Sequence, residues 1–450
     1  MTTAVENLTS TFSALLGAER VKSDEATRKS FALGKMLPDC VVSPGSEEEV
    51  AAALERATEL GLAVVPCRNG TKLPIGNTPK RYDVALCLRE MNRIWHYEPA
   101  DLTVTVETGM KLADFQRFVG KAGLWLALDP PFEAKASIGG ILAANSSGPS
   151  RFLYGQARDL TLGMSVATSE GKVIRTGGRV VKNVTGYDLS KLFIGSFGTL
   201  GVITRASFKL SPLPALRASF RIRGQELLQI REFRRQVVRS PLGVQALEFV
   251  DERAGRLAFE GQGLGGIGKG PELWIQVAGV ERAVRRTGEE LERLASMVGA
   301  ECGSIEGEKA EAVWSRLRDF PAWLPEKYPQ ATLLRASLPP AVSEEFIVGS
   351  GSALEAAGAR GAVFAHLGSG IVHLCLLEPP REREAALIGQ LREAAVRLEG
   401  ALILERASEE LKGEMDVWGE AGDALGVMRQ MKATWDPGNT LSPGRFVGGI

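Results

Sequence analysis

In the first half of the chain, the hydrophobic and polar positions form short apolar runs separated by glycine and proline. Ser46 with Glu49 three residues later is typical of a helix start, and Gly61 is typical of a helix end. Alternating apolar and polar residues over 102–109 are typical of a half-buried strand. The pattern predicts helices over 5–18, 46–60 and 111–123, strands over 63–67, 84–88, 102–109 and 200–212, and a hairpin over 160–177 that turns at Glu170-Gly171.

Beyond the prolines at 212 and 214, strands and helices follow one another in a regular exchange. The order strand, helix, strand, strand, helix occurs twice, so this region resembles a loose internal repeat. It predicts an α+β domain with helices on one face of an antiparallel sheet. The predicted elements are strands over 218–223, 243–250, 272–280, 333–339 and 401–407, a hairpin over 362–377, helices over 225–239, 281–298, 342–357 and 380–399, and a final helix followed by an extended tail.

The composition is that of an ordinary globular protein of two or three domains. Lysine and arginine together number 54, as do aspartate and glutamate, so the formal net charge is zero. No general attraction to nucleic acid or anionic lipid follows from such a balance. Hydrophobic residues make up 44% and charged residues 24% of the 450 residues, which excludes a disordered chain.

The five cysteines are scattered singly, and no C-x-x-C occurs. By itself the chain therefore lacks the spaced thiolates of an iron–sulfur cluster or a structural zinc site. The N-terminal residues carry no basic region before an apolar run, and no apolar stretch approaches the roughly 18 residues of a membrane span. We expect a cytoplasmic protein that is peripheral to a membrane at most, through a partner.

Two stretches are unusually rich in small residues, 136–159 and 182–204. Small side chains let a ligand approach the backbone closely, so both stretches suit a large, flat, phosphate-bearing cofactor. The G-x-G-x-x-G run at 263–268 does not indicate a phosphate-binding site. A phosphate-binding run must open a helix, whereas here Pro271 and a predicted strand follow, so a loop is the better interpretation.

Three residues of the second half are candidates for chemistry. His366 and His373 flank a tight turn, which suits a metal pair or a general base, but two ordinary strand histidines without a third ligand would have the same pattern. Arg335 lies inside a strand pattern, where it either pairs with a carboxylate or binds an acidic substrate. With three histidines and no G-x-S-x-G, a serine hydrolase is excluded.

Several motifs, in this order, resemble a known family. They are PCRNGTKLPIG, ASIGGILAANSSGP, YGQARDLTLGMSV, KNVTGYDLSKLFIGSFGTLGVIT and, at the end, WDPGNTLSPGRF. The chain is similar from about Pro38 onward to FAD-linked oxidases of the vanillyl-alcohol-oxidase / p-cresol-methylhydroxylase class, most strongly over 136–212. Within that class it is most similar to the FAD-binding, E-type subunits of bacterial glycolate oxidases.

This resemblance implies an α+β fold in which a two-part FAD-binding domain of the p-cresol-methylhydroxylase type precedes an α+β substrate or cap domain with an antiparallel sheet. The implied parts are an N-terminal helical extension (1–37), the FAD-binding domain (38–213), the cap domain (214–425) and a C-terminal segment that packs back on the FAD-binding domain (426–450). The implied cofactor residues are Arg68, Asn69, Gly70, Thr71 and Lys72 at the pyrophosphate, Ser137, Gly139 and Gly140 beside it, Pro130, Asn145 and Gly148 nearby, and Gly198, Gly201 and Ile203 along the adenosine.

Some positions depart from the family pattern. Asn69 stands where some members carry a histidine that binds FAD covalently, so the FAD is expected to be non-covalent. Ser369, Ile371 and Arg406 replace residues that the metal-dependent branch has around its histidines, so no metal is expected. Phe197 replaces a glutamate of the other branch, and Ser442 replaces a common asparagine.

The resemblance implies oxidation of a small 2-hydroxy acid of the glycolate or D-lactate type to the 2-oxo acid. Arg335 is expected to anchor the carboxylate, and His366 or His373 to act as the base. Electrons must then pass to an iron–sulfur subunit, and a second flavoprotein subunit is a further expected partner. Two alternatives stay open at this point: a subunit that only relays electrons or assembles the complex, and a separate oxidase of another alcohol, amine or lactone.

Overall fold

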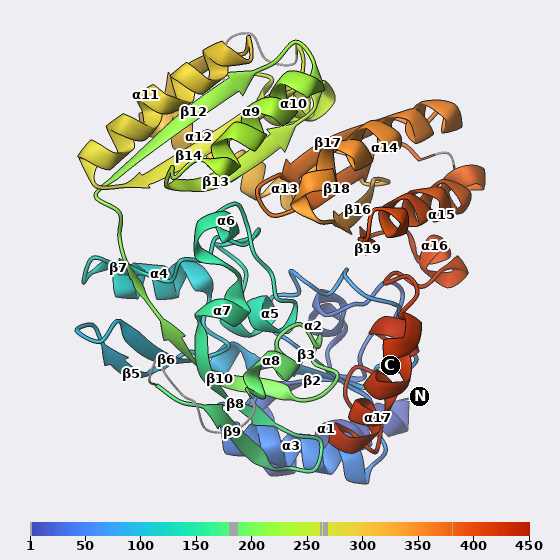
Figure 1. Ribbon diagram of the computed structural model, residues 1–450. Helices are drawn as coiled ribbons and strands as arrows, with labels where there is room; N and C mark the ends of the chain where they lie inside the picture. Colours follow the sequence, from blue (N-terminus) through green and yellow to red (C-terminus); the bar gives the residue numbers. More distant parts are fainter. Residues whose placement is uncertain (1, 180–187, 262, 264–268, 380) are drawn as a thin grey trace.

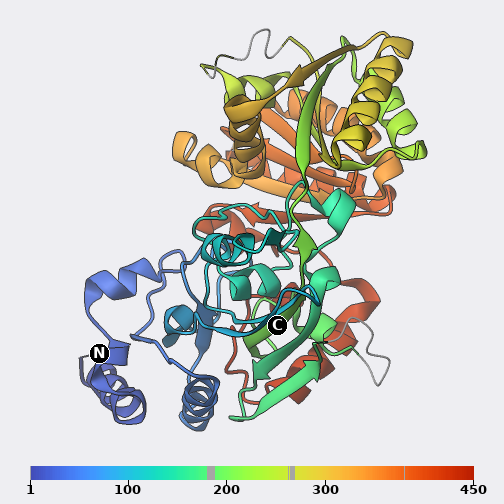
Figure 2. The same cartoon turned by 90° about the vertical axis from the view of Figure 1, so that its left-hand side faces the viewer.

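The computed structural model describes residues 2–179, 188–261, 263, 269–379 and 381–450. Figure 1 shows two lobes that meet along a broad face, with both chain ends in the same lobe. Residues up to 212 build three sheets in the lower lobe, and residues 216–406 build one large sheet in the upper lobe. In Figure 2, the strand that leads into the upper lobe is seen to connect the two.

The first sheet has the strand order β1-β2-β4-β3, in which β2, β4 and β3 are parallel. Its strands are β1 (Val21–Lys22), β2 (Cys40–Val42), β3 (Val64–Cys67) and β4 (Val84–Cys87). Helices α1 (Thr2–Leu16), α2 (Glu25–Ser30) and α3 (Glu47–Glu59) accompany it. Because β1 pairs with β2, the stretch 1–37 is part of this sheet rather than purely helical.

Helix α3 begins as the sequence predicts, but only one of the two hydrogen bonds that Ser46 and Glu49 could form at its start is present. Ser46 Oγ accepts a hydrogen bond from the backbone N–H of Glu49 at 3.2 Å. The Glu49 carboxylate turns instead to the backbone N–H of Gly45 at 2.7 Å and to Arg20. On α1, Phe12 is fully buried while Leu15 is 42% exposed.

The second sheet is antiparallel, with the order β5-β6-β10-β8-β9, and the predicted hairpin forms its β8–β9 edge. The strands are β5 (Ile94–Glu98), β6 (Thr103–Glu107), β8 (Thr161–Ala167), β9 (Val173–Gly177) and β10 (Val202–Lys209), and β7 (Leu124–Trp125) pairs with β11 (Ser211–Pro212). The helices between them are α4 (Leu112–Gly120), α5 (Ile138–Ala143), α6 (Arg151–Tyr154), α7 (Ala157–Leu160) and α8 (Ser190–Phe193).

The large sheet confirms the internal repeat. Its order is β15-β12-β14-β13-β17-β18-β16-β19, and the two halves join where β13 pairs with β17. Outward from this joint, the order is β13-β14-β12-β15 in one half and β17-β18-β16-β19 in the other, so equivalent strands occupy equivalent places. The strands are β12 (Leu216–Arg223), β13 (Val244–Val250), β14 (Glu272–Gly279), β15 (Glu301–Ile305), β16 (Thr332–Ser337), β17 (Gly361–His366), β18 (Ile371–Leu376) and β19 (Ala401–Arg406).

Helices cover both faces of this sheet, so the prediction of helices on one face was wrong. The main core lies under α9 (Leu227–Arg239), α11 (Glu281–Met297), α14 (Ser343–Ala357) and α15 (Arg381–Arg397). A second core on the opposite face is closed by α10 (Glu252–Phe259), α12 (Gly307–Arg318) and α13 (Phe320–Lys327). These three helices were not predicted. Trp274 and Phe364 alternate with the main-core residues along their strands, so this face also needs cover from water.

After α16 (Glu409–Glu414), the chain returns to the lower lobe with α17 (Leu425–Trp435). The backbone of Val64 in β3 exchanges hydrogen bonds with Thr440 and Ser442, at 2.7 and 2.9 Å. In Figure 1 this segment lies beside α1 at the foot of the molecule. Of the 263–268 glycine run only Gly263 is described, and it lies between helix α10 and strand β14.

Candidate functional site

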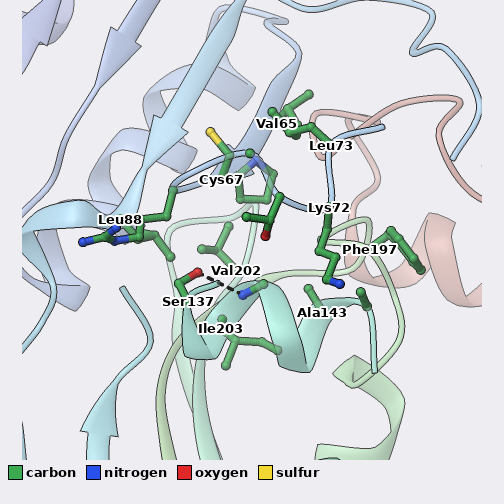
Figure 3. Close-up of a pocket in the computed structure, with 18 of the residues that line it drawn as sticks. Val65, Cys67, Lys72, Leu73, Leu88, Ser137, Ala143, Phe197, Val202 and Ile203 are labelled. Carbon is green, nitrogen blue, oxygen red and sulfur yellow. Dashed lines mark hydrogen bonds between the residues drawn. The ribbon is translucent and has the colours of Figure 1, made fainter. Parts of the chain in front are cut away.

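A cavity of about 820 Å³, open to solvent on one side, lies between the end of β3, helix α5 and residues 196–203. We call it the loop cavity. Figure 3 shows Lys72 and Phe197 on one side of it and Ser137 and Ile203 along its floor. Most of the predicted cofactor residues line it, namely Arg68, Asn69, Gly70, Thr71, Lys72, Ser137, Gly139, Gly140, Gly198, Gly201 and Ile203. The part of the second small-residue stretch over 182–187 lies outside the described residues.

The turn after β3 offers a run of unused hydrogen-bond donors to this cavity. The backbone N–H groups of Asn69, Gly70, Thr71 and Lys72 make no hydrogen bond to another described residue. Gly70 has a φ of 71°, which lets the turn fold tightly. Consecutive free N–H groups in such a turn form a nest for an anion. The turn therefore fits the pyrophosphate of a dinucleotide.

Arg445, which the sequence did not single out, lies in the wall of the same cavity. It is 3% exposed, and its Nη2 donates to the carbonyl oxygens of Leu73 and Ile75 at 2.8 and 2.5 Å. No described carboxylate lies within 4 Å, and Nη1 has no partner. Burial lowers the pKa of Arg445 to about 10. A buried cation without an anion is costly, so a bound phosphate would complete this site.

The glycines of α5 give the loop cavity space rather than hydrogen-bond donors. The N–H of Gly139 already donates to Thr108 and that of Gly140 to the Ser137 hydroxyl, so neither is free for a ligand. These glycines supply space instead. A Cβ on Gly198, whose φ is 69°, would lie 2.6 Å from Pro66. Any larger residue there would push against Pro66 in β3, the strand that leads into the turn with the free N–H groups.

Three predicted cofactor residues do not line the loop cavity. Pro130 is buried and lines neither of the cavities described here. Asn145 also lines neither, and its side chain donates to Gln156. Gly148 lines the adjacent cavity, and it must be glycine because a Cβ would lie 1.8 Å from the carbonyl oxygen of Asp129.

The adjacent cavity, which we call the histidine cavity, lies between the lobes and encloses about 940 Å³ including its open mouth. It shares Thr71, Lys72, Ala144 and Phe197 with the loop cavity. Arg335, His366 and His373, predicted separately from the sequence, all line it. The shared wall means that a flat cofactor held by the loop cavity would border the space in front of these three side chains.

His366 belongs to a well-aligned pair with Glu248. The β13–β17 register sets the two residues opposite each other, and His366 Nδ1 lies 2.8 and 2.6 Å from the two Glu248 oxygens. Burial raises the pKa of Glu248, while His366 and Arg151 oppose that rise. One proton shared between the carboxylate and Nδ1 leaves Nε2 free to accept another.

His373 is paired less well. Its Nδ1 lies 3.2 Å from a Glu405 oxygen but is not aligned for a hydrogen bond. Burial lowers the pKa of His373, and the Glu405 carboxylate opposes that fall. The same carboxylate lies 3.4 Å from Arg335 Nε, and although burial opposes it, attraction by His373, Arg335 and Lys72 holds the Glu405 pKa at about 2. The two histidine rings are 5.4 Å apart.

The charge of the histidine cavity is strongly positive. One carboxylate, Glu405, lines it together with the cations Lys72, Arg151, Arg318, Arg335 and Arg406. Burial lowers the pKa of Lys72 to about 8. Arg318 is neutralised by Glu133 and Asp319, but Lys72, Arg151 and Arg406 have no described carboxylate within 4 Å. The cavity therefore suits an anionic substrate.

Glu248 and Arg151 were not recognised from the sequence. Glu248 could have been noticed as the only acidic residue inside the apolar run of β13, but its partner His366 lies 118 residues away. Among the described residues, no group of three or more histidine, cysteine, aspartate or glutamate side chains is placed to hold a metal ion. No helix in the described part of the chain is long and apolar enough to cross a membrane.

The sequence matches two family models. Residues 38–177 match the FAD binding domain, and residues 225–446 match the C-terminal domain of FAD linked oxidases. The expected class of fold and the cofactor FAD are thereby confirmed.

The relatives include two subunits of glycolate oxidases. The chain is 29% identical over 423 residues to glycolate oxidase subunit GlcD of Bacillus subtilis, covering 91% of this chain and 89% of the relative. It is 33% identical over 310 residues to glycolate oxidase subunit GlcE of Escherichia coli, covering 68% and 75%. A D-2-hydroxyglutarate dehydrogenase of Xanthomonas citri is 27% identical, with 91% and 89% covered.

Solved structures of low sequence identity share the fold. 4-Ethylphenol oxidase from Gulosibacter chungangensis superposes with a TM-score of 0.77 at 20% identity, covering 98% of this chain and 96% of that one. p-Cresol methylhydroxylase superposes with a TM-score of 0.75 at 16% identity, with the same coverage.

Proposed function

Because the chain belongs to the FAD-linked oxidases, we propose that it oxidises a 2-hydroxy acid to the 2-oxo acid and passes the electrons to an iron–sulfur partner. The chain is an FAD-dependent oxidoreductase related to hydroxy acid dehydrogenases and oxidases. The observation that carries the proposal is the wall of Lys72 and Phe197 shared by the two cavities. It sets a cationic cavity with a histidine–glutamate pair directly beside the cofactor cavity.

In such a reaction, the residues of the histidine cavity have different roles. Arg335 binds the substrate carboxylate, since its guanidinium lies 3.4 Å from Glu405 without a well-formed hydrogen bond. His366 takes the hydroxyl proton at Nε2, because Glu248 holds Nδ1. Phe197 and the neighbouring Phe320 keep water away from the reacting carbon. FAD supplies the acceptor for the hydride that leaves Cα, so the alcohol loses two electrons and two protons in all.

Non-covalent binding of FAD is part of the proposal. Asn69 stands in the turn after β3, where its side chain donates to the backbone carbonyl of Lys135. The turn N–H groups, Arg445 and the shape of the loop cavity hold FAD without a bond. We also propose the domain bounds given above, with residues 426–450 returning to the FAD-binding domain.

An electron-accepting partner is needed because the electrons taken from the substrate must leave the flavin. The five cysteines form no disulfide, and no group of three or more histidine, cysteine, aspartate or glutamate side chains among the described residues is placed to hold metal ions. Relatives named as two different glycolate oxidase subunits support membership of a complex that contains another flavoprotein. We propose an iron–sulfur subunit as the acceptor.

The visible spectrum of the purified chain tests the function. We expect the purified chain to show a flavin absorption band, and denaturation to release the flavin into solution. The band should bleach when one 2-hydroxy acid is added anaerobically. A flavin band that no hydroxy acid bleaches would favour the alternative, a subunit that relays electrons or assembles the complex. Peroxide formation without a partner would contradict the iron–sulfur acceptor.

Replacing Arg335 with methionine tests the anchor. We expect KM for the hydroxy acid to rise by about 10- to 100-fold, because a charge-assisted hydrogen bond to a carboxylate contributes about 1.5–3 kcal/mol. Steady-state kinetics with an artificial acceptor measures this. Arg360→Met is the control, since Arg360 is an exposed arginine of the same lobe, 57% accessible at its side chain. An unchanged KM in Arg335→Met would show that Arg335 does not bind the substrate carboxylate.

A further inference from the structure

Arg151 is a charge in the histidine cavity that no described ion pair explains. It begins the short helix α6, which lies inside the first small-residue stretch, and it is partly buried. Its only side-chain hydrogen bond to a described residue runs from Nη1 to the Ser147 hydroxyl at 3.2 Å. A guanidinium has five N–H donors arranged to grip a carboxylate. Most of those of Arg151 are unused.

No nearby carboxylate is free to take this charge. The closest acidic groups by their electrostatic influence are Asp159 and Glu248. Glu248 is committed to His366, and Asp159 accepts from the backbone N–H of Gln156 at 2.8 Å. Neither forms an ion pair with Arg151 within 4 Å. A structural ion pair therefore does not account for this arginine.

The position of Arg151 is well supported. Ser150, its neighbour, is 1% exposed and is held by Asp129 at 2.7 Å and by Gln245 of β13 at 2.8 Å. These contacts fasten α6 against the end of β13. In Figure 1, α6 lies directly beneath β13, on the lower side of the space between the lobes. The guanidinium is thus presented to the cavity by a fixed element rather than by a free loop.

Arg335 enters the same cavity from a different place. It lies on β16, and β17 and β18 stand between that strand and β13. At about 4.8 Å per strand, these are separate ends of the cavity. The two arginines nevertheless interact, because Arg335 helps burial to lower the pKa of Arg151. Their repulsion is relieved when anions lie between them.

We infer that the substrate is a 2-hydroxy dicarboxylic acid, with the carboxylate next to the hydroxyl on Arg335 and the distal carboxylate on Arg151. This inference rests on the proposed function and narrows its substrate class. Glycolate and lactate would leave Arg151 unpaired, whereas an acid of four or five carbons with a second carboxylate satisfies both arginines. Lys72, at the wall shared with the loop cavity, stays free to face the cofactor.

The test compares substrates and one substitution in the FAD-loaded chain. Anaerobic flavin reduction is measured with glycolate, both lactates, both malates and both 2-hydroxyglutarates. We expect kcat/KM for one hydroxy diacid to exceed that for lactate by at least about 10-fold. Arg151→Met should lower kcat/KM for the diacid by about 10- to 100-fold and lower that for lactate much less, so that the preference for the diacid is lost.

Two controls separate this result from damage to the fold. Arg158→Met removes an exposed arginine from the next helix, α7 (Ala157–Leu160), and should change no rate. Arg151→Lys keeps the charge without the fork and should recover part of the diacid rate. FAD content is measured for every variant, so that a loss of cofactor is recognised as such.

A binding measurement makes the inference independent of turnover. Glutarate, a diacid without the hydroxyl group, is titrated by calorimetry into the FAD-loaded chain, with butyrate as the mono-acid. We expect glutarate to bind more tightly than butyrate, and Arg151→Met to remove the difference. If no hydroxy acid reduces the flavin, the proposed function fails, while the glutarate titration still decides the second anion site.

Several outcomes would overturn the inference. Equal losses for lactate and diacid in Arg151→Met would make Arg151 a general support of the fold. A preference for lactate that Arg151→Met does not alter would make its charge irrelevant to the substrate.

Discussion

His366→Gln is expected to lower kcat by about 10²- to 10⁴-fold, the usual contribution of a positioned general base. Glutamine keeps the size and polarity of the side chain but cannot accept a proton at neutral pH. Glu248, whose carboxylate oxygen lies 2.6 Å from Nδ1, orients the histidine ring. The substitution removes the base and leaves Glu248 without the ring that it orients. The measurement is the rate of flavin reduction after rapid anaerobic mixing with substrate.

His373→Gln is the internal comparison for this prediction. Its imidazole lies 3.2 Å from Glu405 without alignment, so we expect a smaller loss of rate. His96→Gln, on β5 in the lower lobe, should have no effect. If His373→Gln slowed reduction more than His366→Gln did, His373 would be the base instead.

Lys432→Met is expected to lower the free energy of unfolding of the lower lobe by about 3–5 kcal/mol, because it leaves a buried carboxylate without its partner. Lys432 Nζ lies 2.5 Å from Asp436 Oδ2 and donates to the carbonyl oxygens of Thr199 and Leu441 at 2.9 and 2.7 Å. Lysine and aspartate are 7% and 1% exposed. This one ammonium group thus joins α17, the glycine-rich wall of the loop cavity and the C-terminal tail.

Denaturant unfolding monitored by tryptophan and flavin fluorescence measures this loss. The double variant Lys432→Met, Asp436→Asn should be more stable than Lys432→Met alone, because removing both charges avoids an unpaired one. The two oxygens of Asp436 now accept from the N–H groups of Thr440 and Leu441, and the single oxygen of an asparagine can still accept from one of them. Equal stability of all three chains would show that the buried pair contributes nothing.

Much of the fold was predictable because its signals are local. Alternation over 102–109 predicted β6, and the turn at Gly171, with φ of 75°, predicted the β8–β9 hairpin. The internal repeat was visible in the order of strands and helices. The helices α10, α12 and α13 were missed because their apolar faces match a sheet face whose exposure the sequence pattern does not reveal.

For the candidate site, residue types were predictable and partners were not. The turn at 68–72 was predicted as an anion nest, and its unused N–H groups agree with that interpretation. Gly139 and Gly140 line the loop cavity, but their N–H groups already donate to Thr108 and Ser137. Arg445 was overlooked because nothing near it in the sequence reveals its burial beside Leu73 and Ile75.

The sequence by itself determined the class of the protein, its cofactor and the two histidines and one arginine of the second cavity. Those properties depend on short motifs whose residues act together within one turn or strand. Only the tertiary structure decided that Glu248 supports His366, that Arg151 faces Arg335 across one cavity, and that Phe197 divides that cavity from the other. These relations join segments about 100 or more residues apart, and strand pairing and the packing of the lobes, not local pattern, bring them together.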